Sequence, residues 1–81
     1  MSMDKVEIAQ IVHYHRKRGN LSRVELAELA DVGKTVVYDI EKARKDYRID
    51  TLLKVLRVLN IDLRLESPLM EEYETSSHKE K

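Results

Sequence analysis

The feature that most constrains the fold is residues 21–40, which read as two short helices separated by a tight turn. Ser22 is followed three residues later by Glu25, the spacing of a capping box, so a helix is predicted to begin at Arg23 and end near Ala30. The apolar residues of this first helix are predicted to lie on one buried face, and they are Leu26, Ala27 and Ala30. Ala27 is small enough to let two helices cross closely at a steep angle.

Asp31, Val32 and Gly33 are predicted to form the turn, with Asp31 in a left-handed backbone conformation. A second short helix is predicted from Lys34 to about Glu41. Its apolar spacing separates a buried face from an exposed one. The buried residues are predicted to be Val37 and Ile40, and the outward residues Lys34, Thr35 and Tyr38.

Two further helices complete the predicted core. Asp4 to Arg18 has Ile8, Ile11, Val12 and His15 at helical spacing and is followed by the stop signal Gly19-Asn20. After a loop, Asp50 is expected to cap a helix that ends at a left-handed Asn60. The apolar face of that helix consists of Leu52, Val55, Leu56 and Leu59. The chain is therefore predicted to form four helices around one core.

A different period follows the fourth predicted helix. Ile61, Leu63 and Leu65 alternate with polar residues, which is typical of a strand, and Ser67-Pro68 ends the pattern. A lone strand leaves its backbone groups without partners. The simplest partner is the same strand of a second copy, so Ile61, Leu63 and Leu65 are predicted to form a two-stranded dimerisation ribbon.

Composition divides the chain into a domain, residues 1–66, and an acidic tail, residues 67–81, that is expected to be disordered. Residues 1–65 hold 13 basic and 10 acidic side chains, a net charge of +3, whereas residues 66–81 hold 2 and 5, a net charge of −3. The absence of Cys excludes a disulfide scaffold and thiol chemistry. No apolar run is long enough for a membrane span or a secretory signal, so a cytoplasmic protein is expected.

The pattern of residues 21–40, continued by residues 49–61, resembles the Xre/Cro family of lambda-repressor-like regulators over roughly residues 8–65. Within that family, the short strand-like segment 61–65 looks most like that of the HipB-type antitoxins. The resemblance implies a mainly α fold: a lambda-repressor-like four-helix DNA-binding domain with a short C-terminal strand. It also implies a dimeric, sequence-specific repressor that controls its own operon and neutralises a HipA-like kinase toxin.

In helix-turn-helix proteins the start of the second helix meets base edges in the major groove, while flanking groups contact phosphates. The candidates for base contacts are Gly33, Lys34, Thr35, Val36 and Tyr38. The candidates for phosphate contacts are Arg23, Lys42, Arg44 and Lys45, with Arg16, Lys17 and Arg18 as weaker ones. Two reading helices related by a dimer axis would read a palindromic operator with half-sites roughly 34 Å apart, or a multiple of that spacing.

Catalysis and metal binding find little support in the sequence. His13 and His15 are two positions apart and so point to different faces of a helix, and His15 is expected to be a partly buried packing residue. No phosphate loop or nucleophile elbow is present, so neither an enzyme nor a cofactor is predicted. Two alternatives to the antitoxin stay open: a stand-alone repressor, and an adaptor that binds another protein through its acidic tail.

Overall fold

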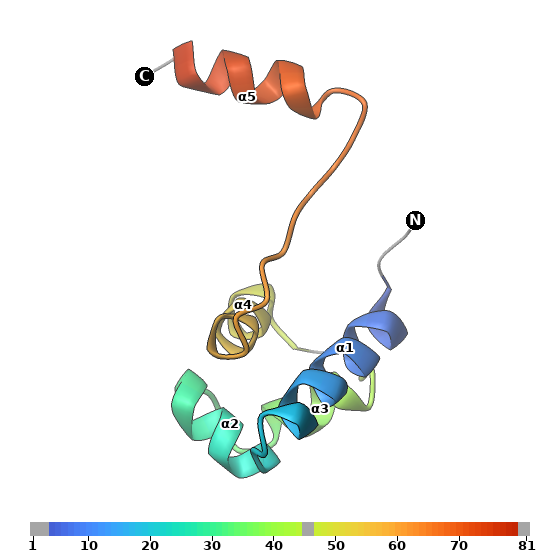
Figure 1. The fold of residues 1–81 in the computed structure, drawn as a ribbon, viewed down its shortest axis with the longest axis vertical. Coiled ribbons are helices and arrows are strands. Elements are labelled where there is room, and N and C mark those ends of the chain that lie inside the picture. The colour runs from blue at the N-terminus through green and yellow to red at the C-terminus, as the bar shows by residue number, and fades with distance from the viewer. Residues whose placement is uncertain (1–3, 45–46, 80–81) are drawn as a thin grey trace.

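The computed structural model describes residues 4–44 and 47–79. Within these residues the helices are α1 (Lys5–Arg18), α2 (Arg23–Ala30), α3 (Val36–Glu41), α4 (Ile49–Val58) and α5 (Met70–Lys79), and there is no strand. Figure 1 shows α1 to α4 gathered in one bundle, from which an extended segment leads away to α5. The molecule is elongated as a result, with principal extents of 43 × 26 × 25 Å.

Local capping explains where the first two helices begin. At α1, the Asp4 side chain accepts a hydrogen bond of 2.9 Å from the Glu7 backbone N–H. At α2, Ser22 Oγ accepts from the Glu25 N–H at 3.0 Å, and Glu25 Oε1 accepts from the Ser22 N–H at 2.8 Å. These bonds satisfy N–H groups that have no partner within the helix. The predicted capping box and the predicted bounds of α2 are confirmed.

The core is a single cluster to which all four bundled helices contribute. Its buried residues are Val12, Leu26, Ala27, Ala30, Val37, Ile40, Leu52, Val55 and Leu56. The predicted buried faces of α2, α3 and most of α4 are thereby confirmed. Burying each large aliphatic side chain contributes about 1.5–3 kcal/mol relative to leaving it exposed. This packing holds the short α3 in place between α1, α2 and α4, with which it makes contact.

Several connections use residues in the left-handed backbone region. The predictions for Asp31 (φ 57°) and Asn60 (φ 59°) are confirmed, and Asn20 adopts the same conformation at φ 57°. Ala43 also lies there, at φ 55°, two residues after the end of α3. Left-handed backbone is costly for an alanine because its Cβ crowds the following carbonyl oxygen.

Two predicted helix starts are wrong by a short distance. Lys34 and Thr35 belong to a turn, and α3 begins only at Val36, because the Val36 N–H bonds to the Gly33 carbonyl at 3.1 Å and closes a tighter turn first. Asp50 lies inside the first turn of α4, where its carboxylate accepts from the Thr51 N–H at 2.8 Å.

Helix α4 therefore begins at Ile49, one residue before Asp50, and Arg48 occupies the cap position without a side-chain cap bond.

The prediction for His15 is also wrong. Its side chain is exposed and its ring Nδ1 lies 2.7 Å from the Ile11 carbonyl oxygen. The next residue, Arg16, is the buried one.

The segment predicted as a strand is extended and keeps an alternating pattern of burial. Ile61 and Leu63 pack against the core, whereas Asp62 and Arg64 are exposed. Leu65, the third predicted ribbon residue, is 73% exposed. The pairing of this segment with a second copy stays a prediction, because a single chain offers it no partner strand.

The tail differs from the predicted disorder, since Met70–Lys79 forms the helix α5. Glu71 and Glu72 lie in its first turn, where negative charge favours the helix dipole. Its preceding residue Leu69 and its own Tyr73 are 67% and 64% exposed. None of the helices described in the structure is both long and apolar enough to cross a membrane.

Candidate nucleic-acid interface

The turn before α3 and the outer face of α3 carry the predicted base-contact residues. Lys34 and Thr35 are exposed in the turn, and Tyr38 is exposed on the first full turn of α3. Val36 is partly buried and packs against the core. Gly33 is exposed, and an added Cβ there would meet only the Val36 side chain at 3.7 Å. The backbone therefore does not demand glycine at this position.

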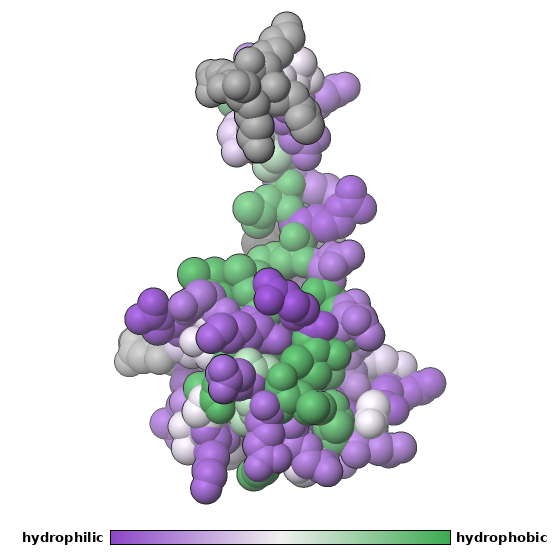
Figure 2. Space-filling view, turned by 90° about the vertical axis from the view of Figure 1, so that its left-hand side faces the viewer, coloured by the Kyte–Doolittle hydropathy of each residue, from purple (hydrophilic) through white to green (hydrophobic). Residues whose placement is uncertain are grey.

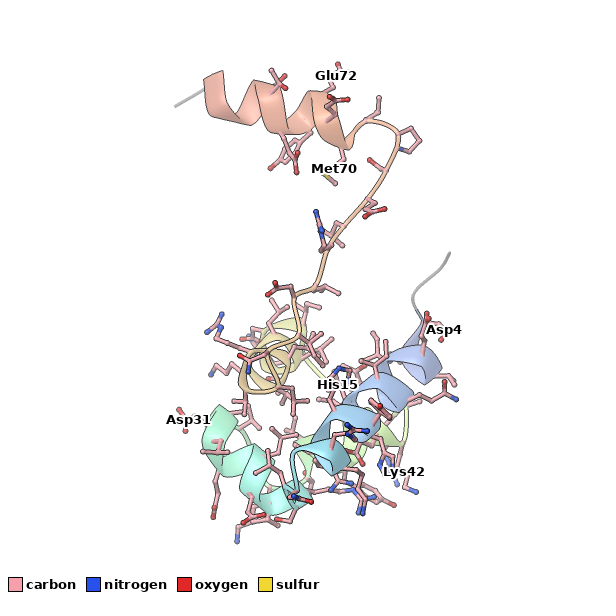
Figure 3. The ribbon with its side chains drawn as sticks, in the orientation of Figure 1. Asp4, His15, Asp31, Lys42, Met70 and Glu72 are labelled. Carbon is pink, nitrogen blue, oxygen red and sulfur yellow. The ribbon has the colours of Figure 1, made fainter. Side chains whose placement is uncertain are left out.

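Tyr38 is also the point at which three predicted phosphate-contact residues meet. The guanidinium carbon atoms of Arg23 and Arg44 and the Nζ atom of Lys42 each lie 5.6 Å from the centre of the Tyr38 ring. Arg23 comes from the start of α2, while Lys42 and Arg44 follow α3; Figure 3 labels Lys42 at that end of the helix. The fourth candidate, Lys45, lies outside the described residues.

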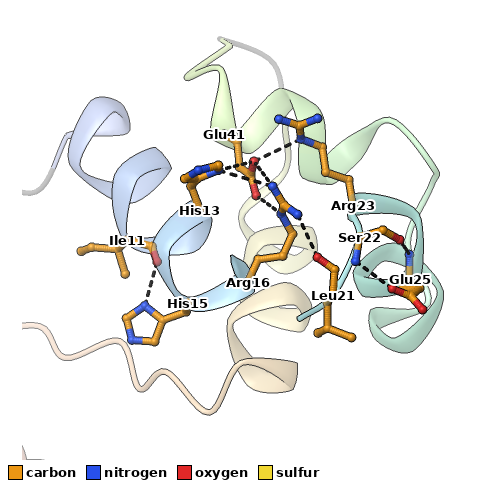
Figure 4. A network of polar contacts seen from close by, with 9 residues as sticks. All are labelled: Ile11, His13, His15, Arg16, Leu21, Ser22, Arg23, Glu25 and Glu41. Carbon is orange, nitrogen blue, oxygen red and sulfur yellow. Dashed lines mark hydrogen bonds and ion pairs between the residues drawn. The ribbon is translucent and has the colours of Figure 1, made fainter. Parts of the chain in front are cut away.

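A buried carboxylate lies behind this surface, and Figure 4 shows the groups that meet there. The Glu41 side chain is only 2% exposed. Arg16 donates to it twice, from Nε to Oε2 at 2.6 Å and from Nη2 to Oε1 at 3.1 Å. Arg23 Nε donates to Oε1 at 3.1 Å, and His13 Nδ1 lies 3.1 Å from the same oxygen. Glu41 therefore connects α1 and α2 to the end of α3.

Two opposing effects determine the charge of Glu41. Burial raises the pKa of this carboxyl, but the hydrogen bonds from Arg16, His13 and Arg23 outweigh burial and hold the pKa below its ordinary value. Glu41 is thus held as a carboxylate. Arg16 is in turn fixed by a hydrogen bond of 2.8 Å from Nη1 to the Leu21 carbonyl, so its donors face inward.

Sequence reasoning missed this network. The basic run predicts weak phosphate contacts for Arg16, Lys17 and Arg18, but Arg16 is only 6% exposed, whereas the other two are exposed. A signal was present in the spacing. Arg16 lies four residues after the buried Val12, and Glu41 lies four residues after the buried Val37, so both fall on apolar faces.

In the part of the chain that the structure describes, no group of three His, Cys, Asp or Glu side chains is arranged to hold a metal ion. His13 instead contacts Glu41. The arrangement around α3 is an exposed polar surface flanked by cations, and it offers hydrogen-bond donors and positive charge to an anionic partner.

Comparison with known proteins gives the class of this fold. A family model described as helix-turn-helix matches residues 12–65, which is more than half of the chain. The chain belongs to the helix-turn-helix family. No curated protein sequence matched the chain.

Several solved structures share the fold of this chain. A chain described as MDT Protein and a chain of a HipA-HipB-O2-O3 complex each superpose with a TM-score of 0.73, and a chain of a HipB-O4 20mer complex with 0.72. In each case the identity is 16%, and the match covers 84% of this chain and 96% of the other. The predicted resemblance to Xre/Cro regulators of the HipB type is confirmed as a shared fold.

Proposed function

We propose that this protein is a sequence-specific DNA-binding repressor that inserts α3 and its preceding turn into the major groove. The observation that carries the proposal is the exposed pair Lys34 and Thr35, flanked by the cations around Tyr38. Lys34 can donate to guanine acceptors, and Thr35 can hydrogen-bond a base or contact a thymine methyl group. The flanking cations supply contacts to the phosphate backbone, which position the protein without reading sequence.

The decisive experiment is a gel shift with the DNA upstream of the protein's own gene. Lys34→Ala is expected to weaken specific binding by about 1–3 kcal/mol because a good base contact is lost, and Thr35→Ala is expected to relax sequence preference. Lys54→Ala on α4 removes the same charge from an exposed position outside the proposed interface and serves as the control. Unchanged affinity and preference in Lys34→Ala would contradict the assignment.

We further propose that the repressor is a HipB-like antitoxin that regulates its own operon and binds a HipA-like kinase toxin. The shared fold with HipB, including the chain from the HipA-HipB-O2-O3 complex, supports this choice. The test is co-purification with a kinase-like protein encoded beside it. If no such gene adjoins, or if the two proteins do not associate, a stand-alone repressor is the better description.

We propose that two copies join through residues 61–65. Ile61 and Leu63 cover their own core, which leaves Leu65 as the exposed apolar residue at the end of the segment. Figure 2 shows hydrophobic side chains continuing from the body along the segment that leads to α5. Pairing the segment with its counterpart would satisfy its backbone groups and cover Leu65.

Leu65→Asp tests this dimer more cleanly than a change at Leu63, because Leu65 does not pack into the core. Sedimentation is expected to show monomers for Leu65→Asp. Leu69→Asp is the matched control, since Leu69 is similarly exposed at 67% but lies beyond the proposed ribbon. A stable Leu65→Asp dimer together with a dissociated Leu69→Asp protein would place the interface at Leu69, next to α5, instead.

A second candidate function is an adaptor that binds another protein through α5. The exposed Leu69 and Tyr73 beside the acidic Glu71 and Glu72 favour it. A salt titration separates the two functions, because phosphate contacts release counterions and make affinity for DNA fall steeply with salt.

A further inference from the structure

The Tyr38 ring brings together cations from separate parts of the chain. Arg23 stands at the first position of α2, Lys42 directly follows α3, and Arg44 lies two residues further on. All three charged groups lie at 5.6 Å from the ring centre. The negative face of an aromatic ring attracts such cations.

Two of the three cations, Arg23 and Arg44, also form ion pairs with carboxylates. Arg23 Nε bonds to the buried Glu41 at 3.1 Å, and Arg44 Nε lies 3.7 Å from Asp39 Oδ1. Among the described residues, no carboxylate lies within ion-pairing distance of Lys42, and the ring is its contact. The guanidinium groups of Arg23 and Arg44 retain further N–H donors beyond these single contacts.

Three cations so close to one point repel one another, and two carboxylates do not neutralise them completely. An anion that reached all three would relieve this repulsion and use their remaining donors. Tyr38 itself is 39% exposed, and Lys42 and Arg44 are exposed as well, so a partner in solution can reach the cluster.

We infer that Tyr38 is a positioning residue whose ring gathers Arg23, Lys42 and Arg44 into a single clamp for the phosphates of a nucleic-acid backbone. The face of the ring performs this role, and the hydroxyl group is not needed for it. This differs from the sequence-based expectation that Tyr38 contacts a base. The inference rests on the proposed DNA binding and specifies how the backbone is held.

The test compares Tyr38→Phe, which keeps the ring, with Tyr38→Leu, which removes it. Binding of each variant is measured between about 50 and 200 mM salt on two duplexes, the protein's own upstream DNA and a duplex of unrelated sequence. Tyr38→Phe is expected to match the wild type on both. Tyr38→Leu is expected to lose roughly tenfold in affinity on both, since each exposed cation–π contact corresponds to about a two- to fivefold effect. Its salt dependence should also be shallower by about one to two phosphate contacts.

Two results would overturn the clamp. If Tyr38→Leu binds the unrelated duplex with wild-type affinity and salt dependence, the ring does not position the cations. If Tyr38→Phe loses affinity for the upstream DNA alone, the hydroxyl reads a base. The proposed repressor function is judged separately, by whether the wild type prefers the upstream DNA at all.

A double-mutant cycle guards against a general disturbance of the fold in Tyr38→Leu. Lys42→Gln is expected to weaken binding to the unrelated duplex in the wild-type background and to have a smaller effect in the Tyr38→Leu background, because the ring no longer orients the lysine. Strictly additive effects of the two changes would also count against the clamp.

Discussion

Glu41 shows how one residue can link the stability of the bundle to the geometry of its exposed face. Its carboxylate meets the buried Arg16 on one side and the half-exposed Arg23 on the other. A buried ion pair is not in itself evidence of large net stabilisation, because removing both charges from water offsets much of their attraction. Breaking such a pair on one side only is costly, since the remaining charge is left without compensation.

Glu41→Gln removes the charge while keeping the shape, and it leaves Arg16 buried without its counterion. The free energy of unfolding is expected to fall by roughly 3 kcal/mol, as measured by urea denaturation. Glu28→Gln makes the same chemical change on the exposed face of α2 and is expected to stay within about 0.5 kcal/mol of the wild type. Equal stability of the two variants would show that the network contributes little.

The lowered pKa of Glu41 predicts how stability depends on pH. In the unfolded chain the carboxyl titrates at its ordinary value of 4.5, and in the folded protein it titrates lower. Its contribution is therefore fully present above pH 4.5 and is lost as the pH falls through the folded pKa. Denaturation series below pH 4.5 are expected to show a shallower loss of stability for Glu41→Gln than for the wild type. A parallel loss in both would contradict a lowered pKa.

Hydrogen bonds between residues close together in the sequence were predictable, whereas those between residues far apart in the sequence were not. The bond between Ser22 and Glu25 spans three residues and follows from helix geometry. The bond between Arg16 and Glu41 spans 25 residues, so it depends on how the helices pack. Apolar spacing could mark both positions as inward, but it could not pair them.

At the scale of elements, α3 is the shortest of the bundled helices. It has only six residues, begins after a tight turn that closes at Val36, and ends at Glu41, two residues before the left-handed Ala43. Helix boundaries depend on competition between such turns, so apolar periodicity predicted the buried Val37 and Ile40 correctly but placed the start too early. The same limit explains the misplaced Asp50, which satisfies the N–H of its neighbour from inside the helix.

Ala43→Gly is expected to stabilise the protein by about 1 kcal/mol, because glycine adopts the left-handed conformation without the crowding of a Cβ. Thermal unfolding measures the change. Glu28→Gly, an exposed position inside α2, is the control and is expected to destabilise by a similar amount. If both glycine variants destabilise equally, Ala43 is not strained in the folded protein.

At the scale of the whole molecule, α5 lies apart from the four-helix bundle, as Figure 1 shows. From Met70 to Ser76 none of its side chains is buried. The core was largely predictable because α2, α3 and α4 bury the apolar residues that their spacing marks, whereas α5 has a polar sequence and little apolar surface of its own. The proposed ribbon stays a prediction, because it would join two copies and a single chain cannot show that association.

Deleting residues 69–81 is therefore expected to leave the melting temperature, the dimer and DNA binding unchanged. Calorimetry, sedimentation and the gel shift measure these three properties. Any affinity for a protein partner through α5 would be lost in the same truncated chain. A fall in melting temperature would show that α5 packs against the bundle in solution.

Because α3 is short, we expect it to unfold only together with the rest of the bundle. Six residues are too few for a helix to persist alone in water, so α3 exists only while its neighbours hold Val37 and Ile40. The backbone amides of Ile40 and Glu41 are therefore expected to exchange with deuterium only when the entire bundle unfolds. Native-state exchange under increasing urea should then give these amides the same opening free energy as global denaturation. If α3 reads DNA as proposed, it can do so only while the whole domain is folded, and it has no local unfolded state for a partner to capture.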